Sequence, residues 1–211
     1  MEYLKLKWIK TGIICGFITV FVFPAMILLD LPVQFALTLA ASFGILLLIS
    51  SIGLYHFISL NKNSVTLQLG VLFNIIASSV VVLMITVQLG LFSGIKAYGQ
   101  DVQPEVKTYV FKTTNLTQLS LDVAWDIFIS LGTILLAVSM LSHPRLGKII
   151  GGAGIIIGAG LLVLNIYTFP IPPGEAGLID LGPFTALWYL AVTIMISLSI
   201  PWVKESLQKT D

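Results

Sequence analysis

Two aspartates at the start of a long apolar run are the residues of this chain best placed to do chemistry. Asp122 and Asp126 are four residues apart, so on a helix they project from one face, with Thr133 about two turns further along it. An ionised carboxylate that faces lipid costs ~2.5–3.5 kcal/mol, so we expect Asp126 to face the protein interior. Two acids this close can share a proton, which suits a proton relay or a cation site.

Two amides are expected at about the same depth in the membrane as Asp126. Asn165 lies in a later apolar run. Gln88 lies in an earlier one, on a polar stripe of one helical face made by Gly70, Asn74, Ser78 and Gln88. We predict that Asn165 and Gln88 contribute to the same binding site. The simpler alternative is that Asp122 only caps the membrane edge, while Asp126 bonds Asn165 or a loop backbone.

A second pair of acids, Glu175 and Asp180, lies in the proline-rich segment that follows Asn165. Prolines fix the φ angles of this segment, while its glycines permit turns. The segment is predicted either to be a lid that holds acids over Asp122 and Asp126, or a rigid hairpin that only links two spans.

A basic turn after the aspartate-bearing run contains His143, Arg145 and Lys148. Basic residues beside lipid headgroups ordinarily contact anionic lipid, which we predict here, with a phosphate site as the alternative. The chain has only two histidines and one cysteine, too few for the usual zinc sets, and it contains no common hydrolase or nucleotide-binding motif. We therefore predict no metal, no cofactor and no catalytic residue.

The composition is that of a membrane protein. Hydrophobic residues make up 57% of the 211 residues, charged residues only 10%, and the mean hydropathy is +1.01. Soluble domains carry about 25% charged residues. A net charge of +1 leaves no basic face for nucleic acid.

The apolar runs predict an all-α bundle of six transmembrane helices that forms a single membrane domain over 1–211. A long outer loop is expected at 93–120, with a short strand at 106–112. Aromatic residues at the ends of the last span, Trp188 and Tyr189 at one and Trp202 at the other, are expected to anchor it at the membrane surfaces. The six predicted spans are 11–29, 35–60, 67–92, 121–141, 146–169 and 184–203.

Glycines recur on one face of the fifth predicted span, where a neighbouring helix backbone could come close. We expect this face to be the central packing surface of the bundle. Its members are Gly147, Gly151, Gly154 and Gly158, and Asn165 continues it.

The distribution of basic residues predicts the orientation. With six spans both termini lie on one side, and eight of the eleven Lys and Arg residues lie there too: Lys5, Lys7, Lys10, Lys62, Arg145, Lys148, Lys204 and Lys209. The excess of basic residues predicts a multi-pass protein of the cell membrane with both termini in the cytoplasm.

Several short stretches of the C-terminal half resemble a bacterial family of small multi-span membrane proteins of unknown function. They are 122–128, 143–147, Asn165 with Phe169-Pro170, and 181–190. The resemblance implies a fold of several membrane spans and nothing about chemistry.

The sequence predicts a small transporter, or a proton- or cation-linked solute-binding protein, with an outward-facing acidic site. Its partners would be the lipid bilayer and a small cation, proton or polar solute. One alternative is a non-enzymatic accessory or sensor protein that binds a partner through the glycine face, as a homo- or hetero-oligomer. A membrane-embedded hydrolase is the third hypothesis.

Overall fold

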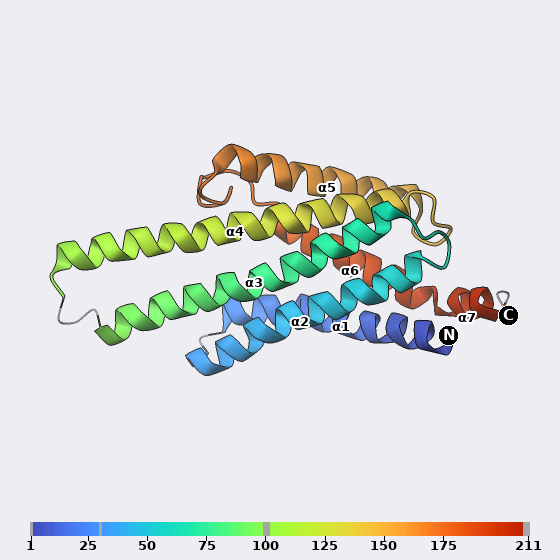
Figure 1. Ribbon diagram of the computed structural model, residues 1–211, viewed down its shortest axis with the longest axis horizontal. Coiled ribbons are helices and arrows are strands. Elements are labelled where there is room, and N and C mark those ends of the chain that lie inside the picture. The colour runs from blue at the N-terminus through green and yellow to red at the C-terminus, as the bar shows by residue number, and fades with distance from the viewer. Residues whose placement is uncertain (1, 30, 99–101, 209–211) are drawn as a thin grey trace.

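The computed structural model describes residues 2–29, 31–98 and 102–208, and within these ranges the chain forms helices and no strand. Lys209, one of the basic residues used to predict the orientation, lies outside the described residues, as do Asp30, Asp101 and Asp211. The helices are α1 (Glu2–Leu28), α2 (Val33–Ile58), α3 (Val65–Tyr98), α4 (Pro104–Met140), α5 (Gly147–Thr168), α6 (Gly182–Leu198) and α7 (Ile200–Gln208) (Figure 1).

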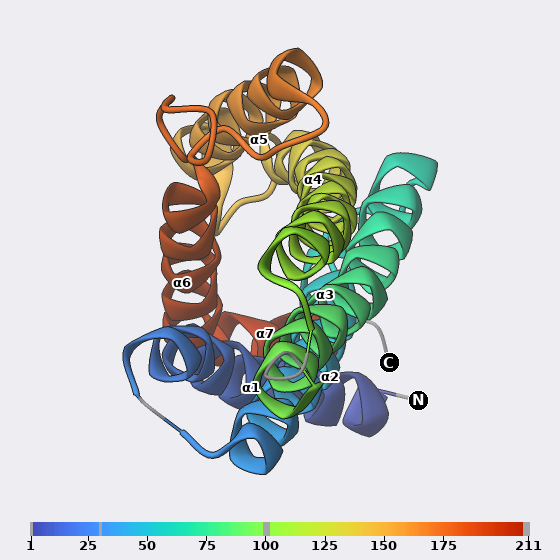
Figure 2. The ribbon, with the colours of Figure 1, turned by 90° about the vertical axis from the view of Figure 1, so that its left-hand side faces the viewer.

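Successive helices α1 to α6 are antiparallel and form a ring (Figure 1). Along the chain, α1 packs on α2, α2 on α3, α3 on α4 and α4 on α5, while α6 contacts both α5 and α1 and so closes the ring (Figure 2). We call the end of the bundle with the α1–α2, α3–α4 and α5–α6 connections the hairpin end. The opposite end, with the start of α1 and with α7, is the terminal end (Figure 1).

Among the described residues, α2, α3, α4 and α5 are each long and apolar enough to cross a membrane. The pair α6 and α7 would add a fifth span, although it is bent by 56° at Ser199, which interrupts the span predicted at 184–203. Large apolar side chains also point outward, and Ile149 and Leu28 are 86% and 80% exposed. Such a surface is suited to lipid, so the chain is an all-helical protein of the membrane type.

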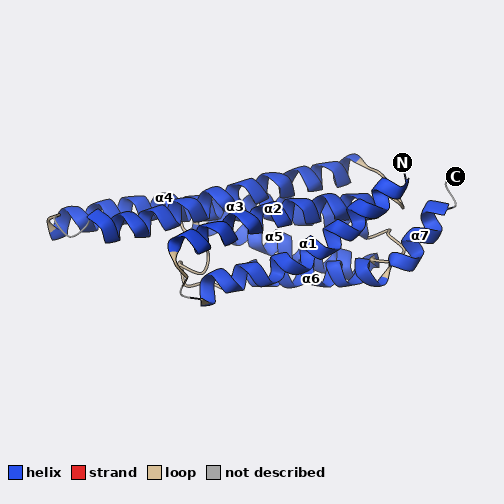
Figure 3. Ribbon diagram, turned by 90° about the horizontal axis from the view of Figure 1, so that it is seen from below, coloured by secondary structure: helices blue, strands red, loops and turns tan. Residues whose placement is uncertain are grey.

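The predicted loop at 93–120 and its strand at 106–112 are wrong, because helix occupies most of both. The 34 residues of α3 and 37 residues of α4 correspond to ~51 and ~55 Å of helix, against a hydrocarbon core of ~30 Å. The α3–α4 hairpin therefore extends past its neighbours at the hairpin end (Figures 1 and 3).

Threonine hydroxyls of the extended part of α4 find their hydrogen-bond partners within the helix itself. The hydroxyls of Thr108, Thr113 and Thr114 each donate to the carbonyl four residues earlier, at 2.8, 3.0 and 2.9 Å. Pro104 opens the helix, where its missing N–H is not needed.

Trp188 and Tyr189 turn into the bundle, contrary to the prediction that they anchor the span from its outer face: Trp188 is buried, and the half-buried Tyr189 directs its hydroxyl to α3 and α4. Trp188 is 4% exposed, and its indole N–H donates to the Ile150 carbonyl at 2.8 Å. A Cβ added at Gly154 would lie 2.6 Å from the indole ring, so the glycine leaves the space that the indole fills.

Candidate functional site

Asp126 and Asn165 form a buried pair between α4 and α5. Asn165 Nδ2 donates to Asp126 Oδ2 at 2.9 Å and to the Leu161 carbonyl at 3.0 Å. Asp126 is 5% exposed and Asn165 is fully buried. Both partners of Nδ2 are acceptors, so the orientation of the amide is fixed by its contacts.

Glycines on α5 allow this pair to form. A Cβ added at Gly151 would lie 2.8 Å from the Ala137 carbonyl oxygen, and one at Gly158 would lie 3.1 Å from the Ser130 carbonyl oxygen. The backbones of α4 and α5 therefore approach closely, which brings a short amide side chain within reach of the aspartate.

Gly147 differs from the other members of the predicted glycine face. Nothing lies within 4 Å of a Cβ built there, and its φ angle is +70°, a conformation that L side chains rarely adopt. Gly147 shapes the entry into α5 and does not pack against a neighbour. The remaining glycines are covered by α4 and by Trp188 of the same chain, so this face is not a free surface for a partner.

Two buried oxygens beside Asp126 have no hydrogen-bond partner among the described residues. They are Asn165 Oδ1 and Ser130 Oγ, and Ser130 lies four residues after Asp126 on the same face of α4. Buried polar atoms without a partner are rare in folded proteins, and a bound water or ion often satisfies them. The Asp126 carboxylate and the Asn165 amide oxygen, with the Ser130 hydroxyl one turn further along α4, are oxygens of the kinds that bind a proton-carrying water or a small cation.

The other predicted acids gather at the hairpin end. Asp122 is half-buried and lies within electrostatic range of Asp180 and Glu175, and Asp126 lies within range of Asp122 and Asp180. Glu175 and Asp180 are exposed, and Asp180 Oδ1 accepts from the Gly182 N–H at 2.8 Å at the start of α6. No group of three or more metal-ligand side chains close enough to hold a metal ion occurs among the described residues.

Gln88 is not joined to this site. It is half-buried on α3, and within the described part of the chain it makes no hydrogen bond with Asp126 or Asn165. Asn74, another residue of the polar stripe on α3, instead forms hydrogen bonds with Ser51 and Tyr189.

Asn74 is the centre of a buried polar network that the sequence did not reveal. The Tyr189 hydroxyl lies 2.7 Å from Asn74 Nδ2, 3.0 Å from Asn74 Oδ1 and 3.2 Å from Thr133 Oγ1. Asn74 Nδ2 also donates to Ser51 Oγ at 3.3 Å. One network therefore joins α2, α3, α4 and α6. In the sequence, the polar stripe on α3 and the position of Thr133 indicate part of this network. The place of Tyr189 near a span end predicts a membrane anchor, so it gives no sign that the hydroxyl joins the network.

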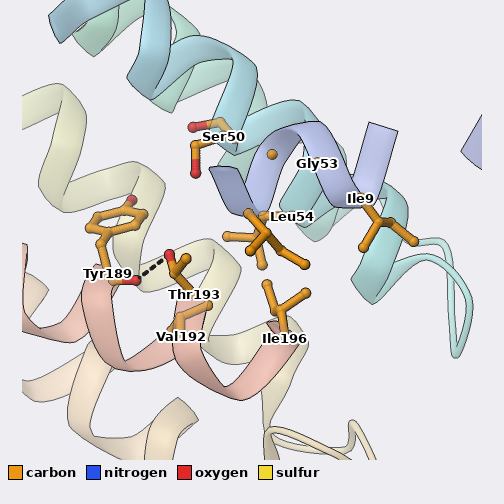
Figure 4. A pocket seen from close by; sticks show the side chains of 11 residues that line it. Ile9, Ser50, Gly53, Leu54, Tyr189, Val192, Thr193 and Ile196 are labelled. Atoms are coloured by element: carbon orange, nitrogen blue, oxygen red, sulfur yellow. Dashed lines mark hydrogen bonds between the residues drawn. The ribbon is translucent and has the colours of Figure 1, made fainter. Parts of the chain in front are cut away.

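A small cavity of about 10 Å³ lies beside this network (Figure 4). Ser50, Ser51, Tyr189 and Thr193 line its polar side, while apolar residues of α1, α2 and α6 line the rest. A space of this size is close to the smallest that holds one water molecule.

The turn at the terminal end places His143 differently from the prediction of lipid contact. His143 is 1% exposed and packs between Phe57 and Trp202, with ring centroids 4.8 and 5.2 Å away. Its Nδ1 accepts from the Arg145 backbone N–H at 3.2 Å. The turn folds inward because aromatic rings of α2 and α7 cover the imidazole. Arg145 and Lys148 are exposed, and for them lipid contact stays a prediction.

Burial lowers the pKa of His143 to about 4, although the nearby Phe57 backbone carbonyl favours the charged form. Because the unfolded chain binds this proton near pH 6.5, stability is expected to fall as the pH drops from about 6.5 towards 4. His143→Phe removes the titrating group, so its thermal midpoint in detergent should depend less on pH over this window. Equal pH dependence of the two proteins would contradict a buried neutral imidazole.

No family model matches the chain, and no curated protein or solved structure matches it. The resemblance of the C-terminal half to a bacterial membrane protein family therefore stays a prediction.

Proposed function

We propose that this protein is a small transporter of the cell membrane, with an outward-facing acidic site that binds a proton or a small cation at Asp126. The single observation that carries the proposal is the buried Asp126–Asn165 pair, in which Asn165 Oδ1 has no hydrogen-bond partner among the described residues, with the unpartnered Ser130 Oγ one turn further along α4. A carboxylate at membrane depth is costly and is typical of ion and proton pathways.

The proposal includes six spans with both termini in the cytoplasm. By length and composition, α2 to α5 and the bent pair α6–α7 are candidate spans. We infer that the 27 residues of α1 form a further crossing, which makes the number of crossings even. Lys62, Arg145 and Lys148 lie in the turns of the terminal end or next to them, where an excess of basic residues favours the cytoplasm.

The hairpin end then faces outward, and its acids form the entrance. Asp122, Glu175 and Asp180 lie within electrostatic range of one another or of Asp126. A cluster of one sign of charge raises the local concentration of its counter-ions, so this arrangement would attract protons and cations towards Asp126.

Replacing Asp126 with Asn tests the proposal. Asn keeps the shape and can still meet Asn165, but it cannot bind and release a proton or balance a cation. In proteoliposomes with an internal pH dye or a cation-sensitive dye, we expect D126N to slow flux at least about tenfold. Glu105→Gln, a matched loss of one carboxylate on the exposed part of α4, should leave flux unchanged. Equal flux in the wild type and D126N at several pH values would overturn the proposal.

A further inference from the structure

Hydroxyl groups follow Asp126 along the interior of the bundle towards the terminal end. Ser130 and Thr133 continue its face of α4, and both are fully buried. Thr133 Oγ1 lies 3.2 Å from the Tyr189 hydroxyl, and Tyr189 is one of the residues that line the small cavity between α1, α2 and α6. At ~1.5 Å per residue, Asp126 lies ~21 Å and Thr133 ~10 Å from the end of α4 at Met140.

We infer that the buried hydroxyls of Ser130, Thr133 and Tyr189 conduct protons between Asp126 and the cavity beside Tyr189. This inference rests on the proposed function and identifies the proton as the transported ion. Asn74 acts as a positioning residue, because its amide holds the Tyr189 hydroxyl at 2.7 and 3.0 Å and so fixes where that hydroxyl points.

The transfer needs no chemistry beyond proton exchange. Asp126 releases a proton to the neighbouring oxygen, and each oxygen of the path accepts one proton on a lone pair while it gives its own O–H proton to the next. Ser130 lies about one turn from both Asp126 and Thr133, so each of these steps requires a bridging water. The proton ends on a water in the cavity, and the hydroxyls turn back to restore the path.

The cavity favours a proton over a hydrated cation. Its volume of about 10 Å³ matches one water molecule, whereas a hydrated ion needs several. A Cβ built at Gly16 would lie 2.8 Å from Thr193 Oγ1 and 2.9 Å from Ser50 Oγ, so both hydroxyls converge on one point next to the cavity. Hydroxyls can donate and accept at once, as a proton path requires.

A purely structural role for the network makes a different prediction. Hydrogen bonds between membrane helices also hold bundles together. If that is the only role of the network, removing one of its hydroxyls lowers thermal stability and leaves proton flux per folded protein unchanged. The experiment must therefore measure both proton flux per folded protein and thermal stability.

Tyr189→Phe removes one hydroxyl and keeps the ring. In liposomes with an internal pH dye and an imposed pH gradient, we expect Y189F to slow proton flux at least about tenfold. Tyr167→Phe is the matched control, because Tyr167 is 79% exposed on α5 and outside the path, and its flux should equal the wild type. Thr133→Val, which replaces a hydroxyl with a methyl of the same shape, should cause the same loss of proton flux. It provides the test of the path if Y189F does not fold.

The outcomes separate this inference from the proposed function. Wild-type flux in Y189F and T133V, with flux lost in D126N, would overturn the hydroxyl path and leave the Asp126 site standing. Lower thermal stability with unchanged flux per folded protein would assign the network a structural role only. Wild-type liposomes that carry a small cation but no protons would overturn the path alone, and wild-type liposomes that carry neither would overturn both proposals.

Discussion

Replacing Gly132 with alanine is expected to cost the folded protein about 2–6 kcal/mol, since overpacking and a broken buried hydrogen bond each cost ~1–3 kcal/mol. A Cβ at Gly132 would overlap Asn74 Oδ1 and would lie 3.1 Å from the Asn74 backbone nitrogen. The side chain of Asn74 must move away from Tyr189, and α3 must separate from α4. The thermal midpoint of the purified protein in detergent measures the effect.

Gly152→Ala provides the matched control for this prediction. Gly152 is also a helical glycine, but nothing lies within 4 Å of its built Cβ. Alanine should stabilise the helix there by ~0.5–1 kcal/mol. If G132A were as stable as G152A, the close approach of α3 and α4 at Asn74 would be wrong.

The proposed orientation, with both termini in the cytoplasm, predicts an all-or-none labelling result. Lys107 on the extended part of α4 and Lys62 in the α2–α3 turn are both exposed, at opposite ends of the bundle. With Cys15 replaced by Ala, a membrane-impermeant maleimide added to intact cells should label Lys107→Cys almost completely. Lys62→Cys should react only after the membrane is made permeable.

The reverse labelling pattern would place the termini outside and turn the acidic entrance towards the cytoplasm. Labelling of both cysteines from outside would contradict a membrane-spanning α3, the helix that separates the two positions. The reverse pattern would remove the outward-facing site from the proposed function, whatever Asp126 binds.

Apolar runs predicted the membrane helices well but not where they end. The span predicted at 35–60 matches α2 (Val33–Ile58), and the span at 146–169 matches α5 (Gly147–Thr168). The loop predicted at 93–120 failed because polarity shows where a chain leaves lipid, whereas a helix continues as long as its backbone bonds are made. Threonines that bond back to their own helix gave no sign of this in a hydropathy pattern.

The sequence predicts a contact of the candidate site only where two polar residues share the same depth in the membrane. Asp126 and Asn165 were expected at one depth, and they meet. Trp188 and Tyr189 were placed at a membrane surface, because aromatic residues near a span end usually lie there. Their burial depends on space beside Gly154 and on the position of Asn74, which only the packed helices provide.

His143 shows the same limit for a polar turn. A histidine between a serine and a proline resembles a solvated turn, yet Phe57 and Trp202 come from helices far away in the sequence to cover it. The sequence therefore indicated which residues could do chemistry, and packing decided which of them share a site.

The most direct test of the Asp126 site is infrared difference spectroscopy of the reconstituted protein as the external pH is stepped. A working proton or cation site at Asp126 should give a protonated-carboxyl C=O band that changes with pH in the wild type. The band should be lost in D126N and kept in E105Q. A carboxyl signal that does not respond to external pH, or that is identical in the wild type and D126N, would show that Asp126 and Asn165 form a closed structural pair.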